Sequence, residues 1–304
     1  MDPGGVHRLL GRQPAARLLQ RRGDPRHRRH RAHRRGRVAG GGGVLPVPPR
    51  RRRLVRAGRA GGGRVKRIAL TLAALLAPLA AQAQALQCAA PAQVERPRPD
   101  LPDARQPRRV LPIGSYTLAI TWSPEYCRTR RDDARNAFQC GGGNRFGFTL
   151  HGLWPDGTGR QWPQYCASTP ILPDAVIRQN LCVTPSAQLL QHEYAKHGTC
   201  MGVSPAAYFN ESRALFQRLR FPDMMVLSRR PNLTAGQVAA AIARLNPGMT
   251  PRSMRITANA RGWLDEVWLC LDKRRRYTAC PAHQGGVTPA TRVKIWRGGR
   301  GADA

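Results

Sequence analysis

The stretch FGFTLHGLWPDG, residues 146–157, contains the clearest strand pattern of the chain. Phe146, Phe148 and Leu150 alternate with other residues, which predicts a strand over Phe146–His151 with one face in the core. The segment 152–159 holds one Pro and three Gly, so we expect the chain to turn there.

The segments on either side predict a mixture of strands and helices. Upstream, Tyr116–Trp122 is mostly apolar and β-prone, which indicates a buried strand, and GGGN at 141–144 indicates a loop. Downstream, cap residues and breakers predict helices over 186–198, 204–218 and 234–245. Arg252–Ala258 and Trp263–Asp272 then resemble an antiparallel strand pair. No βαβ rhythm is visible, so we expect an α+β fold with a central antiparallel sheet flanked by helices.

The charge of the chain is large and unevenly distributed. The 304 residues include 51 Lys and Arg but only 17 Asp and Glu, a formal net charge of +34. Such a balance indicates a polyanionic partner, nucleic acid above all. Residues 1–64 hold 19 of the Arg, 13 Gly and no aromatic residue. We expect this segment to be disordered, because it cannot bury enough apolar surface to offset its ordering entropy.

Residues 65–85 resemble a secretory signal peptide rather than a buried core helix. A short basic run at 65–67 precedes the apolar stretch Ile68–Ala77, and AQA at 81–83 has the form of a cleavage site. Because such a signal is recognised at an N-terminus, we expect translation to begin at Val65 and residues 1–64 to be a gene-calling artefact. A genuine Arg-rich nucleic-acid-binding arm is the alternative.

The sequence thus predicts four parts of the chain and a cellular compartment for the protein. We expect a leader over 1–64, a signal peptide over 65–85, a Pro-rich arm over 86–112 and one folded domain over 113–304. The even count of eight Cys fits an oxidising compartment, so we expect a periplasmic or secreted protein.

Two short segments carry three of the four His that lie outside residues 1–64. One is FTLHGLWPDG at 148–157 and the other is HEYAKHGTC at 192–200. On a helix, the side chains of His192, Glu193, Lys196 and His197 fall within an arc of about 140°. The fourth, His283, lies in a Gly-rich tail, and we expect it to be a solvated surface residue.

This set of side chains suits phosphoryl chemistry better than zinc chemistry. The helical His pair is spaced i, i+5 instead of the i, i+4 of zinc hydrolases, and no third ligand is evident, so we expect no metal and no cofactor. Two imidazoles can serve as acid and base near neutral pH, and a Lys with a further His can neutralise phosphate charge. An attack on phosphorus without metal needs a built-in nucleophile, which the ribose 2′-OH of RNA supplies.

The two segments resemble the two active-site motifs of the ribonuclease T2 family. Ile120–Cys127 also resembles the first strand of that family and Asp265–Asp272 its late core strand, so the resemblance covers about residues 113–282. It implies that 113–304 is the catalytic domain of an endoribonuclease. Such an enzyme cleaves single-stranded RNA through a 2′,3′-cyclic phosphate, and we expect weak base preference.

The resemblance also implies roles for individual residues. His197 would be the base that takes the 2′-OH proton and His151 the acid that protonates the leaving oxygen, although the reverse allocation stays open. Glu193 and Lys196 would stabilise the pentacoordinate phosphate, and His192 would bind phosphate. Trp154 and Asp156 match positions that some relatives use to bind a base, with core packing as the alternative for Trp154. Trp162 would add a stacking face.

The resemblance further implies the disulfides Cys166–Cys200 and Cys270–Cys280. Cys127–Cys140 is a pairing between near neighbours in the sequence, and Cys88 with Cys182 then remains. The Cys166–Cys200 bond would tie the loop after the first motif to the end of the catalytic helix and hold His151 and His197 in register.

Two other functions stay open at this point. One is a secreted basic protein that binds RNA without cleaving it, although such a protein would not need the acid–base set. The other is a nuclease controlled by a dedicated inhibitor. We expect a monomer that binds single-stranded RNA and has no membrane contact after removal of the signal.

Overall fold

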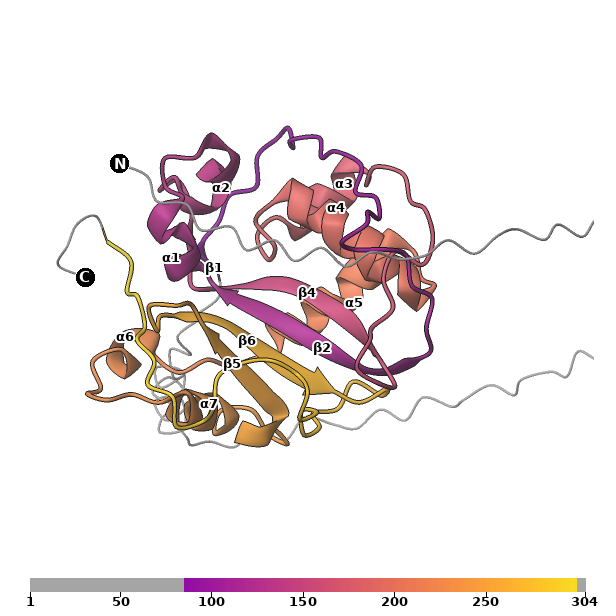
Figure 1. Cartoon of the computed structure of the whole chain (residues 1–304). Coiled ribbons are helices and arrows are strands. Elements are labelled where there is room, and N and C mark those ends of the chain that lie inside the picture. Colours follow the sequence, from indigo (N-terminus) through magenta and orange to yellow (C-terminus); the bar gives the residue numbers. More distant parts are fainter. Residues whose placement is uncertain (1–84, 300–304) are drawn as a thin grey trace, which may run out of the picture. The chain divides into compact units, whose positions relative to one another are not determined.

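The computed structural model describes residues 85–299. The expected leader over 1–64 and the signal peptide, apart from its last residue, lie outside this range. The centre of the fold is a four-stranded antiparallel sheet with the strand order β4-β2-β6-β5 (Figure 1). These strands are β2 (Ile113–Trp122), β4 (Phe148–Gly157), β5 (Met254–Ala258) and β6 (Leu264–Leu271). The short strands β1 (Ala85–Gln87) and β3 (Arg145–Phe146) pair separately.

Short helices surround the sheet and complete the α+β fold. They are α1 (Ser123–Tyr126), α2 (Ala137–Cys140), α3 (Asp174–Asn180), α4 (Ala187–Lys196), α5 (Pro205–Gln217), α6 (Met224–Leu227) and α7 (Ala235–Ala243). In Figure 1, α3 to α5 lie beside β4, whereas α6 and α7 lie at the β5 end of the sheet. Within residues 85–299, no helix is both long enough and apolar enough to cross a membrane.

Three predicted helix starts are confirmed by their caps. The side chain of Ser186 accepts a hydrogen bond from the Leu189 amide, and Ser204 does the same for Ala207. Thr234 forms a capping box with Gln237 at the start of α7. Helix α4 ends at Lys196, slightly earlier than predicted, because the chain tightens into a 3₁₀ turn over Gly198–Met201.

The strand that carries the first motif differs from its prediction at both ends. Phe146 belongs to β3, and β4 continues to Gly157 through the segment that we expected to turn. Pro155 is tolerated because β4 is an edge strand, where a missing backbone donor costs no sheet hydrogen bond.

An irregularity in β4 explains the mixed pattern of its side chains. Ala119 of β2 pairs with Gly152 and Ile120 pairs with Leu150, so His151 is an extra residue without a partner. A bulge of this kind bends the strand and re-aims a side chain, and bulges occur often beside active sites. The bulge also changes which alternate positions are buried, from Leu150 before it to Leu153 after it.

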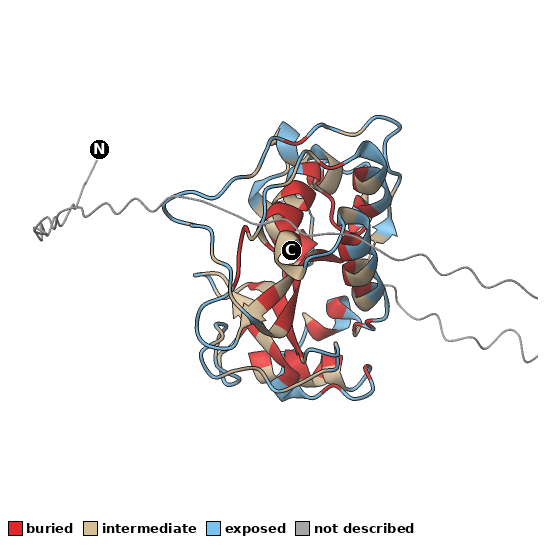
Figure 2. Cartoon of the chain, turned by 90° about the vertical axis from the view of Figure 1, so that its right-hand side faces the viewer, coloured by how far each residue is buried: buried red, intermediate tan, exposed pale blue. Residues whose placement is uncertain are grey.

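The core lies between the sheet and the helices. Figure 2 shows buried residues along the strands and along the helix faces directed at the sheet. The largest fully buried side chains include Tyr208, Phe148 and Phe216. Four disulfides tie loops to this core and form the same pairs that we expected from the sequence: Cys88–Cys182, Cys127–Cys140, Cys166–Cys200 and Cys270–Cys280.

Candidate active site

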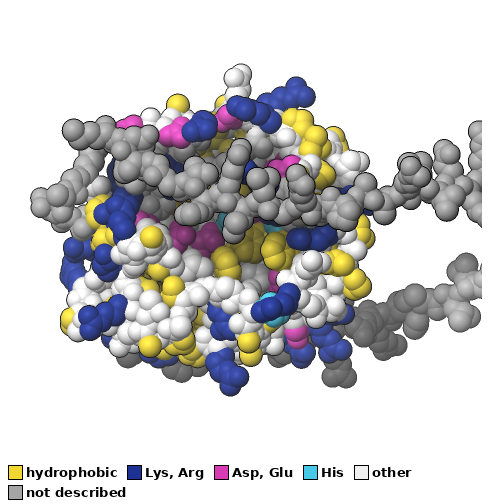
Figure 3. All heavy atoms as spheres, viewed as in Figure 1, with side chains coloured by type: hydrophobic (Ala, Val, Ile, Leu, Met, Phe, Trp, Pro, Cys, Tyr) yellow, Lys and Arg dark blue, Asp and Glu magenta, His cyan; other side chains and the backbone are white. Residues whose placement is uncertain are grey.

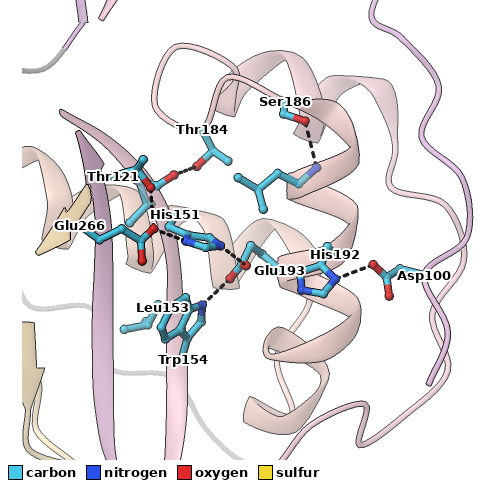
Figure 4. Close-up of polar contacts among 12 residues, drawn as sticks. Asp100, Thr121, His151, Leu153, Trp154, Thr184, Ser186, His192, Glu193 and Glu266 are labelled. Carbon is cyan, nitrogen blue, oxygen red and sulfur yellow. Dashed lines mark hydrogen bonds and ion pairs between the residues drawn. The ribbon is translucent and has the colours of Figure 1, made fainter. Parts of the chain in front are cut away.

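His151 projects from the bulge of β4 toward α4 and is held from two sides (Figure 4). Its Nδ1 lies 2.7 Å from Oε1 of Glu266 on β6. Its Nε2 lies 3.5 Å from Oε1 of Glu193 on α4. The first contact fixes the proton on Nδ1, so Nε2 is the nitrogen directed at the space beside α4.

Glu266 is itself fixed by two further donors. Its Oε1 accepts from the Thr121 hydroxyl at 2.8 Å and its Oε2 accepts from the Trp268 indole at 2.7 Å. Burial raises the pKa of this carboxyl, but the hydrogen bond and charge of His151 outweigh burial and lower the pKa overall. Glu266 is therefore an ionised partner of His151. Glu266 was not predicted from the sequence as a partner of His151, because 115 residues separate the two.

The environment of His151 favours its charged form. Burial lowers the pKa of the imidazole, but the Glu266 hydrogen bond and the charges of Glu193 and Glu266 outweigh burial and raise the pKa above its usual value. The charge of Lys196 opposes this shift without reversing it. His151 is therefore suited to hold and deliver a proton near neutral pH.

Glu193 is fully buried between His151 and Trp154. Its Oε2 accepts a hydrogen bond from the Trp154 indole at 2.8 Å (Figure 4). Burial raises the pKa of the carboxyl, while the charges of His151 and His192 act in the opposite direction. A Cβ at Gly152 would overlap the Glu193 carboxylate, so the Gly after His151 permits the close approach of α4 to β4.

His197 follows the last residue of α4 and has the opposite environment from His151. It is 5% exposed, it stacks on Trp154 with ring centroids 5.5 Å apart, and its Nδ1 has no hydrogen-bond partner among the described residues. Burial lowers the pKa well below its usual value, and the positive charges of Lys196, His192 and His151 add to the effect. His197 is therefore neutral near pH 7 and can accept a proton.

Two further basic residues of α4, Lys196 and His192, lie beside this pair. Lys196 is half-buried, and burial lowers the pKa of its ammonium although Glu193 and Asp100 oppose the shift. His192 is half-buried and its ring lies edge-on to His197, with centroids 6.4 Å apart. Nδ1 of His192 contacts Asp100, a residue that the sequence analysis did not single out.

Trp154 connects these groups. Its ring contacts His151 edge-on at 5.0 Å, stacks on His197 and meets Trp268 edge-on at 5.7 Å. The alternatives of base binding and packing are therefore not exclusive, since Trp154 packs among the site residues and also lines an open cleft.

The cleft has a volume of about 860 Å³ and begins at the site. Trp154, Lys196 and His197 line it together with Asp156 and Trp162. Asp156 accepts hydrogen bonds from Thr117 at 2.9 Å and Ser115 at 3.4 Å, and burial raises the pKa of its carboxyl. On the face seen in Figure 3, hydrophobic, acidic and His side chains gather near the middle, with Lys and Arg mainly around them.

His283 is exposed, as expected, but it also lines the rim of this cleft. Within residues 85–299, no group of three His, Cys, Asp or Glu side chains is arranged to hold a metal ion.

The geometry brings together two imidazoles in opposite environments, an ammonium and a buried carboxylate. His151 is suited to remain charged and His197 to remain neutral, and environments that push two pKa values apart identify acid and base. Lys196 supplies positive charge beside them, and His192 adds a third imidazole. The arrangement can therefore move two protons around an anionic centre.

Comparison with known proteins gives consistent matches. The sequence profile of the Ribonuclease T2 family matches residues 113–280. A protein of Haemophilus influenzae named Probable ribonuclease is 29% identical over 180 residues, which cover 56% of this chain and 61% of that protein. A protein of Aeromonas hydrophila named Ribonuclease is 32% identical over 165 residues, which cover 52% of this chain and 71% of that protein. The chain thus spans less than two thirds of the length of the first relative.

A solved structure has a similar fold. The structure of trichomaglin, described as a novel S-like ribonuclease, aligns with 60% of this chain and 97% of its own, with a TM-score of 0.50 and 20% sequence identity. At this identity the likeness concerns the arrangement of helices and strands.

Proposed function

Because the chain belongs to the ribonuclease T2 family, we propose that it is an endoribonuclease that cleaves single-stranded RNA through a 2′,3′-cyclic phosphate. The observation that carries this proposal concerns His151 and His197, which both contact the Trp154 ring. Their environments shift the two pKa values in opposite directions. Carboxylates surround His151 and raise its pKa, whereas burial and cations lower the pKa of His197.

The proposed first step moves one proton onto the enzyme and one off it. Neutral His197 takes the proton of the ribose 2′-OH, and the 2′-oxygen forms a bond to phosphorus. The bond from phosphorus to the 5′-oxygen breaks, and His151 delivers its Nε2 proton to that leaving oxygen. The products are a 2′,3′-cyclic phosphate and a free 5′-OH. Hydrolysis of the cyclic phosphate would use the same two imidazoles with their roles exchanged.

The remaining residues of α4 would stabilise the charge that develops on phosphorus. Lys196 presents its ammonium and His192 its imidazole, and the charge of Glu193 favours the protonated form of His151 across the 3.5 Å contact. Preorganised groups of this kind act strongly in a site with little water. Their burial therefore supports a role in the transition state.

We also propose that the cleft binds the base next to the cleaved phosphate with little selectivity. Trp154 and Trp162 offer aromatic faces, and stacking on such faces is tolerant of base identity. The Asp156 carboxyl offers one polar contact to a base edge.

The test measures cleavage of single-stranded RNA at about pH 6, the range of an unperturbed imidazole, in EDTA. His151→Ala and His197→Ala should each lower kcat by a factor of about 10² to 10⁴. Unchanged thermal unfolding would show that each variant is folded. RNA binding by a wild-type protein that releases no fragments would instead favour the RNA-binding protein without catalysis.

We further propose that the protein acts in the periplasm or outside the cell. Four disulfides in one domain support an oxidising compartment. Fractionation of the native cells, with the ribonuclease activity followed in each fraction, tests this location.

A further inference from the structure

The segment 86–112, the N-terminal arm, lies along α4 outside the residues that match the family profile. The disulfide Cys88–Cys182 anchors its first part, and the amide of Arg98 donates to Gln188 of α4 at 2.8 Å. Near its end, Arg109 and Gln164 exchange backbone hydrogen bonds of 2.9 Å. Figure 1 shows the arm passing α3 and α4 before it enters β2. The arm is therefore attached to the segment just before α4, to α4 itself, and to the segment that follows β4.

Asp100 is the arm residue that reaches the active site. Its Oδ2 lies 2.6 Å from Nδ1 of His192, and its Oδ1 accepts from the Tyr165 hydroxyl at 2.7 Å. The Asp100 side chain is 16% exposed. Figure 4 shows it facing His192 from outside α4. Both carboxylate oxygens are thus occupied by side chains of the folded domain.

The surroundings keep Asp100 ionised. Burial raises the pKa of its carboxyl, but hydrogen bonds from His192 and Tyr165 and the charge of Lys196 outweigh burial and lower the pKa. An ionised carboxylate accepts hydrogen bonds and cannot donate one, so the proton between Asp100 and His192 belongs to Nδ1 of the imidazole.

Tyr165 indicates that this contact is built into the fold. Its φ is +51°, a conformation that is uncommon for a bulky residue and that persists only where the surroundings enforce it. Its amide donates to the carbonyl of Lys196 at 2.8 Å, and its ring lies edge-on to His192. Tyr165 therefore contacts the end of α4 through its amide and the Asp100 carboxylate of the arm through its hydroxyl.

We propose that Asp100 is a positioning residue of the active site. By holding the Nδ1 proton of His192, it directs the Nε2 of that ring toward the phosphate of the substrate. This inference rests on the proposed ribonuclease function. It extends the site beyond the family motifs to a carboxylate that lies 92 residues before His192.

The test compares Asp100→Asn, Asp100→Glu and the control Asp103→Asn in the full chain. Asp103 is exposed in the same arm, and among the described residues its side chain accepts hydrogen bonds only from the neighbouring amides of Arg105 and Gln106. Asp100→Asn should lower kcat/KM for single-stranded RNA about tenfold, because a neutral amide replaces a charge-assisted hydrogen bond. Asp100→Glu should restore part of the loss, and Asp103→Asn should have no effect.

A double-mutant cycle separates positioning from a general effect on the arm. In a His192→Phe background, Asp100→Asn should change kcat/KM less than about twofold, because the partner through which it acts is gone. An equal tenfold loss in both backgrounds would overturn the proposal. So would full activity of Asp100→Asn in the wild-type background.

Nitrogen NMR of the His192 ring decides the question without RNA. The folded protein should show a protonated Nδ1, and Asp100→Asn should change that signal while the signals of His151 stay in place. An Nδ1 without a proton in the wild type would contradict the proposal even if RNA is cleaved. Absence of cleavage with the expected Nδ1 signal would instead contradict the proposed function alone.

Discussion

Among single residues, the proposed roles of His151 as acid and His197 as base rest on their neighbours. His151 faces two carboxylates, Glu266 and Glu193, and its pKa is raised. His197 is buried beside cations, and its pKa is lowered. The base must be neutral, so activity should rise as the pH increases through the pKa of His197, below 6.5. The acid must be protonated, so activity should fall as the pH increases through the pKa of His151, above 6.5. The pH profile of kcat/KM checks this bell shape.

Glu266→Gln should shift only the falling limb of the pH profile of kcat/KM. Loss of the carboxylate removes the hydrogen bond and charge that hold the His151 proton, so the falling limb should shift down by about one pH unit. Asp265→Asn is the matched control on the same strand: its carboxyl makes no hydrogen bond to His151 among the described contacts and interacts with it through charge alone, so the falling limb should shift less than in Glu266→Gln. A falling limb that stays in place in Glu266→Gln would contradict the assignment of His151 as the acid.

Gly152 should tolerate no side chain. A Cβ there would overlap the Glu193 carboxylate and displace it from His151 and Trp154. Gly152→Ala should therefore lower kcat about 100-fold, as expected for misplacement of a catalytic group. Gly159→Ala is the control, because a Cβ at Gly159 would meet open space. Equal activity of the two variants in the RNA assay would show that the position of Glu193 is unimportant.

At the scale of elements, α4 is the part of the site that could be predicted best. His192, Glu193, Lys196 and His197 are close in sequence, so helical periodicity alone places them on one arc. The partners from other elements could not be predicted, since Glu266 and Asp100 lie 115 and 92 residues from the His that they contact. The local signal for Glu266 is a pair of acidic residues, Asp265 and Glu266, within the otherwise apolar strand β6. Strand β4 continues past Gly152 because it lies at the edge of the sheet. No local sequence pattern shows which strand takes that edge.

The disulfide Cys166–Cys200 should matter for both stability and activity, because it ties the loop after β4 to the end of α4. Replacing both residues by Ser should lower the free energy of unfolding by about 4 kcal/mol, from the entropy of the loop that it closes. It should also lower kcat, because His197 lies next to the freed segment. Replacing the control pair Cys127–Cys140 by Ser should lower the free energy of unfolding by about 3 kcal/mol. It should leave kcat unchanged at a temperature where the protein stays folded. Denaturant unfolding and the RNA assay measure the two effects.

For the whole molecule, the positive charge is expected to favour RNA binding, but it does not identify the chemistry. Residues 1–64 carry half of the net charge of +34, and the remaining basic residues still outnumber the acidic ones by about two to one. The cations that line the cleft are Lys196, Arg160 and Lys273. If these three contact phosphates, the log of 1/KM should fall with the log of salt concentration with a slope of about −2. A KM that is independent of salt would contradict RNA binding through this cleft.

The monomeric state stays a prediction. Light scattering of the purified protein at assay concentration should give the mass of one chain. A larger mass would contradict the monomeric state.

The proposed acid–base transesterification is tested most directly by following phosphorus during cleavage of single-stranded RNA in EDTA. Phosphorus NMR should show a 2′,3′-cyclic phosphate as the first product of the wild-type protein, formed together with a free 5′-OH. His151→Ala and His197→Ala should both fail to produce it. A first product with a 5′-phosphate, or cleavage that EDTA abolishes, would contradict acid–base transesterification by these two residues.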